Sequence, residues 1–444
     1  MRFRYLAVFV TFVAALAFLA AGCGGDDNGD DDGATVAEEE GGEERDVSFD
    51  LPVGVITSFT GDLSSFGEPI DTAAGIAVDI INETIEEEGI EGISVEIVAS
   101  EDDQTDPTAG VEAATKLVQS DNATVIVGAL ASSVSTPIAE SVTVPNGVVQ
   151  ISPASTSPAL TDLADDGFFW RTPPSDALQG QVLAEAMAEE FGADATVNTG
   201  TRNDAYGTAL VGVFEENWEA NGGTIGASVS WNPEASTFDT EAQQLAGGEP
   251  DAWLIIDFPE TFAKVGPALV RAGGWDPTRT FTADGLRSSD LPGDVGEEAT
   301  EGMRGTAPTS EGAPAGDAFA TAYEERAEGV SRQTFDAQAF DAVIVSFLAA
   351  VRGGASDSET IRDNLQAVSG AGEGEGADQY TFEQLGDAIN ALLAGEEIDY
   401  EGASGPINFD ENGDPGAALY EVWQFEGNDI TTLDSFEFSG GDEG

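Results

Sequence analysis

Residues 125–133 read Val-Ile-Val-Gly-Ala-Leu-Ala-Ser-Ser, and residues 148–157 read Val-Val-Gln-Ile-Ser-Pro-Ala-Ser-Thr-Ser. Each stretch is an apolar run typical of a buried strand, followed at once by small hydroxyl residues. In open parallel sheets, ligands bind beyond the carboxyl ends of the strands, where backbone N–H groups and hydroxyls can hold an anion. Both clusters also suit helix starts, because Ser and Thr are common N-caps. Two such clusters on successive strands favour one shared anion site.

The same alternation of strand and helix continues along the chain. Apolar, strand-like runs occur at 53–56, 95–98, 125–127, 148–151, 195–197, 253–256 and 280–282. Helical spacing runs from Ile70 to Ile85, and further amphipathic stretches cover 107–119, 177–190, 207–221, 263–272, 315–326 and 337–351. Alternating strands and helices predict parallel sheets covered on both faces, and 444 residues favour two such sheets rather than one.

A carboxylate follows one of the later strands. Asp284 comes directly after the run 280–282, where the strand is expected to end. A carboxylate at this edge can bind an ammonium group. Asp284-Gly285 also suits an ordinary turn, because Asp and Gly are common turn residues. From these residues alone the turn is the better interpretation.

Composition excludes several classes of function. The chain has 84 acidic and 15 basic residues, a net charge of −69, and no His. Nucleic acid is not an expected partner, because phosphate binding needs clustered Lys and Arg. Without His, a Ser-His-Asp triad and a His-ligated metal are impossible, and the one Cys cannot form an internal disulfide. No Gly-rich nucleotide motif follows a strand, so no nucleotide cofactor is expected. No metal is expected either.

The first 22 residues are typical of a signal peptide. Arg2 and Arg4 precede an apolar run at 6–21 that ends in small residues before Cys23. The sequence Leu-Ala-Ala-Gly-Cys before and including Cys23 resembles a bacterial lipobox, although its Leu stands four residues before the Cys rather than three. That resemblance implies a diacylated Cys23. Ordinary cleavage that leaves a free thiol is the alternative.

An acidic linker follows. Residues 24–46 are mostly Gly, Asp and Glu, which predicts a disordered tether and an anchoring segment over 23–48.

From residue 52 to residue 428 the chain resembles the leucine/isoleucine/valine-binding protein family, the type I periplasmic binding proteins of ABC importers. The markers occur in the family's order: Thr60-Gly61, Phe66-Gly67, 101–107, 128–133, 151–156, Arg171-Thr172, Ala205-Tyr206-Gly207, 301–303, Phe340-Asp341-Ala342, Gly405-Pro406 and Asn408-Phe409-Asp410. Each marker is weak alone, but the ordered set is specific.

The resemblance implies an α/β fold of two Rossmann-like lobes with parallel sheets, joined by three hinge crossings. We expect an N-terminal lobe at 49–175 with 309–404, a C-terminal lobe at 176–308 with 405–438, and an acidic tail at 439–444. It also implies a monomer that binds a ligand and makes or breaks no bond.

The resemblance assigns eight residues to a ligand-binding site. It implies a carboxylate contact at Ser132 with Ser133 beside it, carboxylate and ammonium contacts at Ala154 and Thr156, an ammonium contact at Asp284, and aromatic pocket walls at Phe66, Tyr206 and Phe258. Phe66 and Phe258 stand where many relatives have Tyr, and Asp284 replaces the longer Glu of some members. These departures leave the preference for the ligand's side chain open.

An uncharged anion site a few ångströms from a carboxylate suits a zwitterion. We therefore expect a lipid-anchored extracytoplasmic protein that captures an amino acid, branched-chain or similar, and delivers it to an ABC permease. A sensor or receptor of an amide or small organic acid on the same fold is the alternative. A hydrolase with paired carboxylates is disfavoured, because acid pairs are common by chance in so acidic a chain.

The charge leads to a prediction about salt. Repulsion between so many carboxylates destabilises a compact chain, and salt screens it. We expect the midpoint of thermal unfolding to be higher in molar salt than in dilute buffer. The alternative is a codon-biased genome that replaces Lys with Arg, together with acidic terminal segments. Equal unfolding midpoints in the two buffers would favour that alternative.

Overall fold

The computed structural model describes residue 45 and residues 47–439. The predicted signal peptide, Cys23, nearly all of the tether and residues 440–444 lie outside this range. The described residues belong to one compact unit.

A five-stranded sheet forms from the first third of this unit. Its strands are β1 (Phe49–Thr57), β2 (Ile93–Asp102), β3 (Val125–Val127), β4 (Val149–Ser152) and β5 (Phe169–Arg171), in the order β2-β1-β3-β4-β5 and all parallel. Its helices are α1 (Ser64–Glu88), α2 (Pro107–Gln119), α3 (Ser132–Ile138), α4 (Val144–Asn146), α10 (Gly316–Arg326), α11 (Asp336–Gly353), α12 (Ser358–Val368) and α13 (Leu385–Ala394). We call this sheet with these helices the first lobe.

A seven-stranded sheet forms the second lobe. Its strands are β6 (Thr196–Arg202), β7 (Thr224–Trp231), β8 (Ala252–Ile256), β9 (Thr280–Thr282), β10 (Arg304–Pro308), β14 (Ala417–Glu426) and β15 (Asp429–Ser439), in the order β15-β14-β10-β9-β8-β6-β7. Its helices are α5 (Asp176–Phe191), α6 (Gly207–Ala220), α7 (Asp239–Leu245), α8 (Pro259–Ala272) and α9 (Leu291–Val295). A small sheet of β11 (Asp378–Tyr380), β12 (Ile398–Gly402) and β13 (Gly405–Pro406) completes the described strands.

The second sheet is only partly parallel. β14 runs antiparallel to β10, and β15 runs antiparallel to β14. The two residues that join β14 to β15 suffice for a hairpin, whereas a parallel pair needs a long crossover. The prediction of parallel sheets therefore holds for β6 to β10, and the hairpin is an addition that the strand–helix alternation did not reveal.

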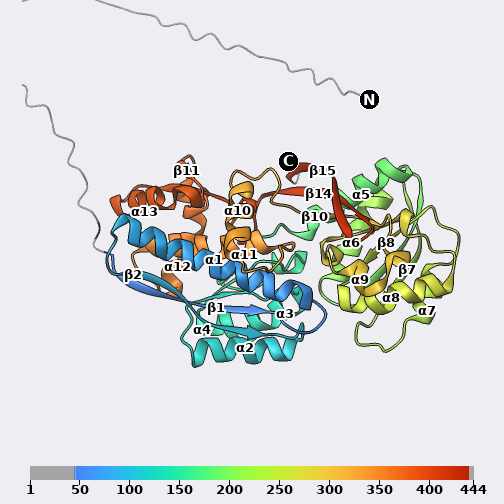
Figure 1. Cartoon of the computed structure of the whole chain (residues 1–444), viewed down its shortest axis with the longest axis horizontal. Coiled ribbons are helices and arrows are strands. Elements are labelled where there is room, and N and C mark those ends of the chain that lie inside the picture. Colours follow the sequence, from blue (N-terminus) through green and yellow to red (C-terminus); the bar gives the residue numbers. More distant parts are fainter. Residues whose placement is uncertain (1–44, 46, 440–444) are drawn as a thin grey trace, which may run out of the picture. The chain divides into compact units, whose positions relative to one another are not determined.

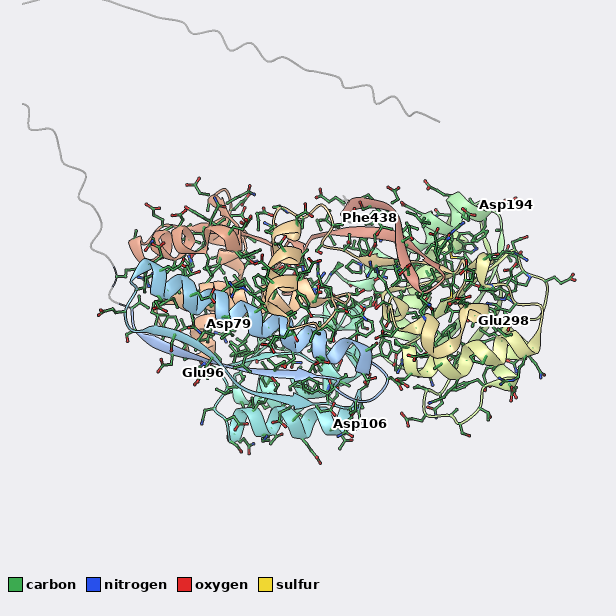
Figure 2. All side chains as sticks on the ribbon, in the orientation of Figure 1. Asp79, Glu96, Asp106, Asp194, Glu298 and Phe438 are labelled. Carbon is green, nitrogen blue, oxygen red and sulfur yellow. The ribbon has the colours of Figure 1, made fainter. Side chains whose placement is uncertain are left out.

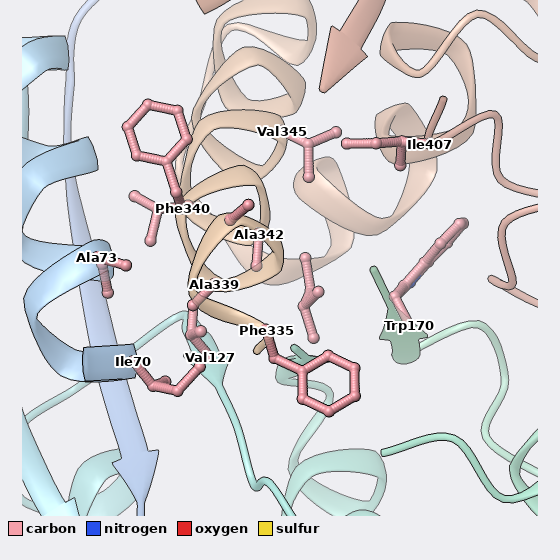
Figure 3. Close-up of a cluster of buried hydrophobic side chains, with 14 of the residues drawn as sticks. Ile70, Ala73, Val127, Trp170, Phe335, Ala339, Phe340, Ala342, Val345 and Ile407 are labelled. Atoms are coloured by element: carbon pink, nitrogen blue, oxygen red, sulfur yellow. The ribbon is translucent and has the colours of Figure 1, made fainter. Parts of the chain in front are cut away.

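Helix α11 is the centre of the first lobe. Every residue from Asp336 to Val351 is buried. Figure 1 shows α11 (orange) beside α1 (blue), and Figure 3 shows Ile70 and Ala73 of α1 and Val127 of β3 facing this helix. Segments far apart in the sequence therefore share one core.

Among the described residues no single helix is long and apolar enough to cross a membrane, and α11 and α12 meet that test only as a pair bent by 105°.

Buried carboxylates fix two of the chain segments that pass between the lobes. Arg171, at the end of β5, is fully buried and forms a bidentate pair with Asp414 (Nε–Oδ1 2.6 Å, Nη2–Oδ2 2.5 Å). Asp341 of α11 accepts hydrogen bonds from Tyr400, Ala403 and Ser404 at 2.6–2.9 Å. These contacts order the segment after β12 and the turn before β14. The lobe boundaries expected from the sequence stay predictions.

Most predicted elements match observed ones, and one local expectation was wrong. The cluster after β3 does begin a helix, α3, but the cluster after β4 does not. There Ser152 Oγ accepts hydrogen bonds from the backbone of Ala154 and Ser155, and only a 3-10 turn, Pro158–Leu160, follows. Pro153 and Pro158 lack N–H groups, so this stretch forms turns rather than a helix.

The acidic residues lie mainly on the outside. Figure 2 labels Asp79, Glu96, Asp106, Asp194 and Glu298, all exposed, on helices, loops and strand β2 of the two lobes. Solvated carboxylates of this kind explain how so charged a chain retains an apolar core.

Candidate ligand-binding site

A cavity lies where the strands of both sheets end. It is lined by Leu63, Phe66, Ile70, Leu130, Ala131, Ser132, Ala154 and Phe335 from the first lobe and by Tyr206, Phe258, Asp284 and Gly285 from the second. Apart from Ile70 in α1 and Phe335 just before α11, these residues follow the carboxyl ends of β1, β3, β4, β6, β8 and β9. This is the edge at which open α/β sheets bind ligands.

The two hydroxyl clusters predicted from the sequence meet at this edge. Ser132 Oγ accepts a hydrogen bond from the backbone N–H of Ser157 (3.2 Å), and the hydroxyls of Ser135 and Ser155 lie 2.8 Å apart. Gly128 makes the tight turn before the first cluster possible, because it has φ +136° and an added Cβ would lie 2.2 Å from the Ile56 carbonyl oxygen. The two clusters therefore lie together, and the shared anion site expected from them stays a prediction.

Arg171 holds the second cluster in place. Its Nη1 donates to the carbonyl oxygen of Ser157 (2.9 Å), and its Nη2 donates to Thr161 Oγ1 (2.7 Å). The same guanidinium pairs with Asp414, so one buried cation fixes both the loop that carries Ala154 and the turn before β14. Arg171 is a positioning residue that the sequence motif contained but to which it gave no role.

Asp284 and Tyr206 form the polar end of the cavity. Tyr206 Oη donates to Asp284 Oδ1 (3.0 Å) and accepts from the backbone N–H of Gly285 (3.3 Å). Burial raises the pKa of the Asp284 carboxyl to about 6, although the bond from Tyr206 opposes this shift. A desolvated carboxyl of this kind gains most when a cation enters beside it.

A second buried carboxyl, Asp176, lies behind this end of the cavity, and sequence reasoning missed it. Asp176 Oδ2 accepts a hydrogen bond from Thr156 Oγ1 (3.0 Å), and Oδ1 has no hydrogen-bond partner among the described residues. Burial, and then the charge of Asp284, raises the pKa of Asp176 well above its usual range. The available signal was its place in Ser175-Asp176, an ordinary helix start that gave no hint of full burial.

Six of the eight predicted site residues line the cavity: Phe66, Ser132, Ala154, Tyr206, Phe258 and Asp284. Thr156 does not line it and instead bonds the buried Asp176. Ser133 is half-buried in α3 and also lies outside the lining. The roles of all eight residues toward a ligand stay predictions.

The comparisons agree with this architecture. Residues 50–420 match the family model described as periplasmic binding protein. The "Leu/Ile/Val-binding protein BraC3" of Rhizobium johnstonii is 24% identical over 386 residues, covering 87% of this chain and 94% of that protein. The "Chemotactic signal transduction system substrate-binding protein BasB" of Halobacterium salinarum is 27% identical over 326 residues, 72% of this chain and 74% of that protein.

A solved structure gives the same fold. The branched-chain amino acid transporter substrate binding protein LivJ of Streptococcus pneumoniae, in complex with isoleucine, superposes with a TM-score of 0.70 at 21% identity, covering 88% of this chain and 99% of that one. The chain therefore belongs to the periplasmic binding protein family, and the resemblance to leucine/isoleucine/valine-binding proteins is confirmed. It is an extracytoplasmic binding protein rather than an enzyme.

The raised pKa of Asp284 predicts a pH-dependent cost. When the pKa of a carboxyl is higher in the folded than in the unfolded protein, the folded protein loses stability as that carboxyl ionises. For Asp284 this loss occurs as the pH rises from about 4 through about 6. Asp284→Asn removes this cost. We expect the free energy of unfolding of this variant, relative to that of the parent, to rise by about 1 kcal/mol between pH 5 and pH 8, as measured by urea unfolding. Asp194→Asn, at an exposed site, is the control. If the difference in free energy of unfolding between Asp284→Asn and the parent stays constant with pH, the raised pKa of Asp284 is contradicted.

Proposed function

We propose that the protein captures an amino acid with an aliphatic side chain, such as leucine, isoleucine or valine, and delivers it to an ABC permease. The observation that carries this proposal is the cavity itself, with one polar end and one apolar end. Asp284 and Tyr206 stand at the polar end, and apart from Ser132 and Gly285 the other lining residues, such as Leu63, Ile70 and Leu130, are apolar. An α-ammonium group fits the first and an aliphatic side chain fits the second.

The ligand's carboxylate would contact the hydroxyl clusters. Ser132 and Ala154 line the cavity, and no Lys or Arg is among the described residues that line it. Neutral donors suit a carboxylate whose charge is balanced within the same ligand by an ammonium group, because the pair enters without net charge. The isoleucine in the complex of the similar LivJ protein has this pair of groups, which supports the choice of ligand.

Asp176 would take part in ammonium binding from behind Asp284 and Thr156. Its unpaired Oδ1 and its repulsion with Asp284 favour the arrival of a positive charge. Binding would then be coupled to closure of the two lobes around the ligand, and the closed form would dock on the permease.

A sensory role is the second candidate. The similarity to a substrate-binding protein of a chemotactic system in Halobacterium salinarum supports it, and the acidic composition agrees with life in high salt. Capture of the ligand would be the same, and the partner would be a transducer rather than a permease. The ligand of such a sensor could be an amide or a small organic acid instead of an amino acid.

A screen by thermal unfolding in molar salt tests the ligand. We expect leucine, isoleucine or valine to raise the unfolding midpoint, since a ligand that binds only the folded state stabilises it by mass action. Amides and small organic acids belong in the same panel. In Asp284→Asn we expect at least a tenfold weaker affinity by calorimetry, because a buried charged hydrogen bond is lost. Asp194→Asn should bind like the parent, and a shift by acids or amides alone would overturn the amino-acid proposal.

We further propose that Cys23 is diacylated and anchors the protein to the outer face of the membrane, with the acidic segment 24–46 as a tether. The support is the sequence around Cys23, which lies outside the described residues. We expect mass spectrometry of the mature protein to find a diacylglycerol-modified N-terminal Cys23, and Cys23→Ser to leave the membrane fraction. A free thiol on Cys23 in membrane-bound protein would contradict the proposal.

A further inference from the structure

Beside the ligand cavity, Asp62 joins the two lobes. It lies in the loop between β1 and α1 of the first lobe, next to Leu63 of the cavity wall. Its Oδ2 accepts hydrogen bonds from Arg202 Nη2 (3.1 Å) and from Thr261 Oγ1 (2.9 Å), both in the second lobe. The Arg202 side chain is 4% exposed and that of Asp62 is 21% exposed. Solvent therefore screens this ion pair much less than a surface pair.

The charges of the lobes make such a contact important. Residues 49–175 with 309–404 contain 40 acidic and 6 basic residues, and residues 176–308 with 405–438 contain 31 acidic and 6 basic residues. Bringing the two lobes together therefore costs electrostatic repulsion. A cation of one lobe that meets a carboxylate of the other offsets part of this cost where they touch.

Arg202 is held ready for Asp62 by its own lobe. Its Nε donates to Asp204, and its Nη1 lies 3.6 Å from Asp257 Oδ1. Burial raises the pKa of Asp257 to about 8, against the opposing effect of Arg202. The remaining nitrogen of the guanidinium, Nη2, faces Asp62.

Arg202 also touches the wall of the cavity. Its guanidinium carbon lies 3.7 Å from the centroid of the Phe258 ring, a cation–π contact. Phe258 stacks on Tyr206, with centroids 5.1 Å apart and planes inclined by 15°. Tyr206 in turn donates to Asp284. A continuous series of contacts thus links the inter-lobe ion pair to the polar end of the cavity.

We propose that the contact of Asp62 with Arg202 and Thr261 is a closure latch that holds the two lobes together and slows release of the ligand. This inference rests on the proposed function, in which lobe closure retains the ligand. Within the latch, Arg202 is a positioning residue: it receives Asp62 on one side and supports Phe258 on the other.

Two variants test the latch from opposite lobes. Asp62→Asn removes the charge and keeps the shape, and Thr261→Val removes the hydroxyl donor at similar volume. The measurements are the distance between spin labels at Asp79→Cys and Glu298→Cys, exposed sites on the two lobes, and the dissociation rate of leucine by stopped flow. Both use the mature chain with Cys23→Ser. We expect each variant to lengthen the inter-lobe distance and to speed leucine release about three- to tenfold.

The double variant and a control separate the latch from a general loss of stability. If Asp62 and Thr261 act through one contact, the double variant releases leucine more slowly than the product of the single effects predicts. Asp239→Asn removes an exposed ion pair with Arg271 inside the second lobe and should change neither measurement. Unchanged distances and release rates in both single variants would overturn the latch.

The distance measurement does not depend on the ligand. If the parent binds no amino acid in the panel, the proposed function fails, and the ligand-free distances alone decide on the latch. A longer inter-lobe distance in Asp62→Asn then supports the latch, and an unchanged distance overturns it.

Discussion

Two carboxyl groups, Asp176 and Asp284, are buried close enough to repel each other. Neither pairs with a cation among the described residues, and burial raises the pKa of both. A folded protein keeps such a pair only where something else stabilises it or where its cost serves a function. Here the cost is balanced by hydrogen bonds from Thr156 and Tyr206, one in each lobe, so the polar end of the cavity depends on both lobes being in place.

Basic residues are scarce in this chain, yet two of them are buried beside the cavity. The sequence has thirteen Arg and two Lys against 84 acidic residues, and Arg171 and Arg202 are almost fully buried. Arg171 fixes the loop that carries Ala154, and Arg202 supports Phe258 from behind. Neither lines the cavity. The cations organise the walls, while the surface facing a ligand keeps neutral donors and carboxyls. A guanidinium suits this task because its planar fork can serve several oxygens and still stack on a ring.

Much of the fold could be predicted from local patterns, and the reason is visible in β3 and α2. The run 125–127 and the stretch 107–119 coincide with observed elements, because a short buried strand and an amphipathic helix each leave a clear periodicity. The hairpin of β14 and β15 was not found, since its half-exposed strands lack a strong apolar run. Asp176 was missed for a different reason: an acid in the first turn of a helix is usually solvated, and only tertiary packing buries this one.

The same balance of charges bears on the net charge of the proposed ligand. A free anion entering the cavity would meet Asp284 and Asp176 without a cation in the lining, and a free cation would leave the apolar walls to enclose unbalanced charge. A zwitterion would avoid both costs, because its ammonium would face the carboxyls while its carboxylate would reach the hydroxyl clusters around Ser132. Under the proposed function, selectivity for a neutral, internally charged ligand would arise from the surroundings of the contacts as much as from the contacts themselves. In so acidic a protein, this places recognition in a desolvated cavity, where the surrounding surface charge has little influence.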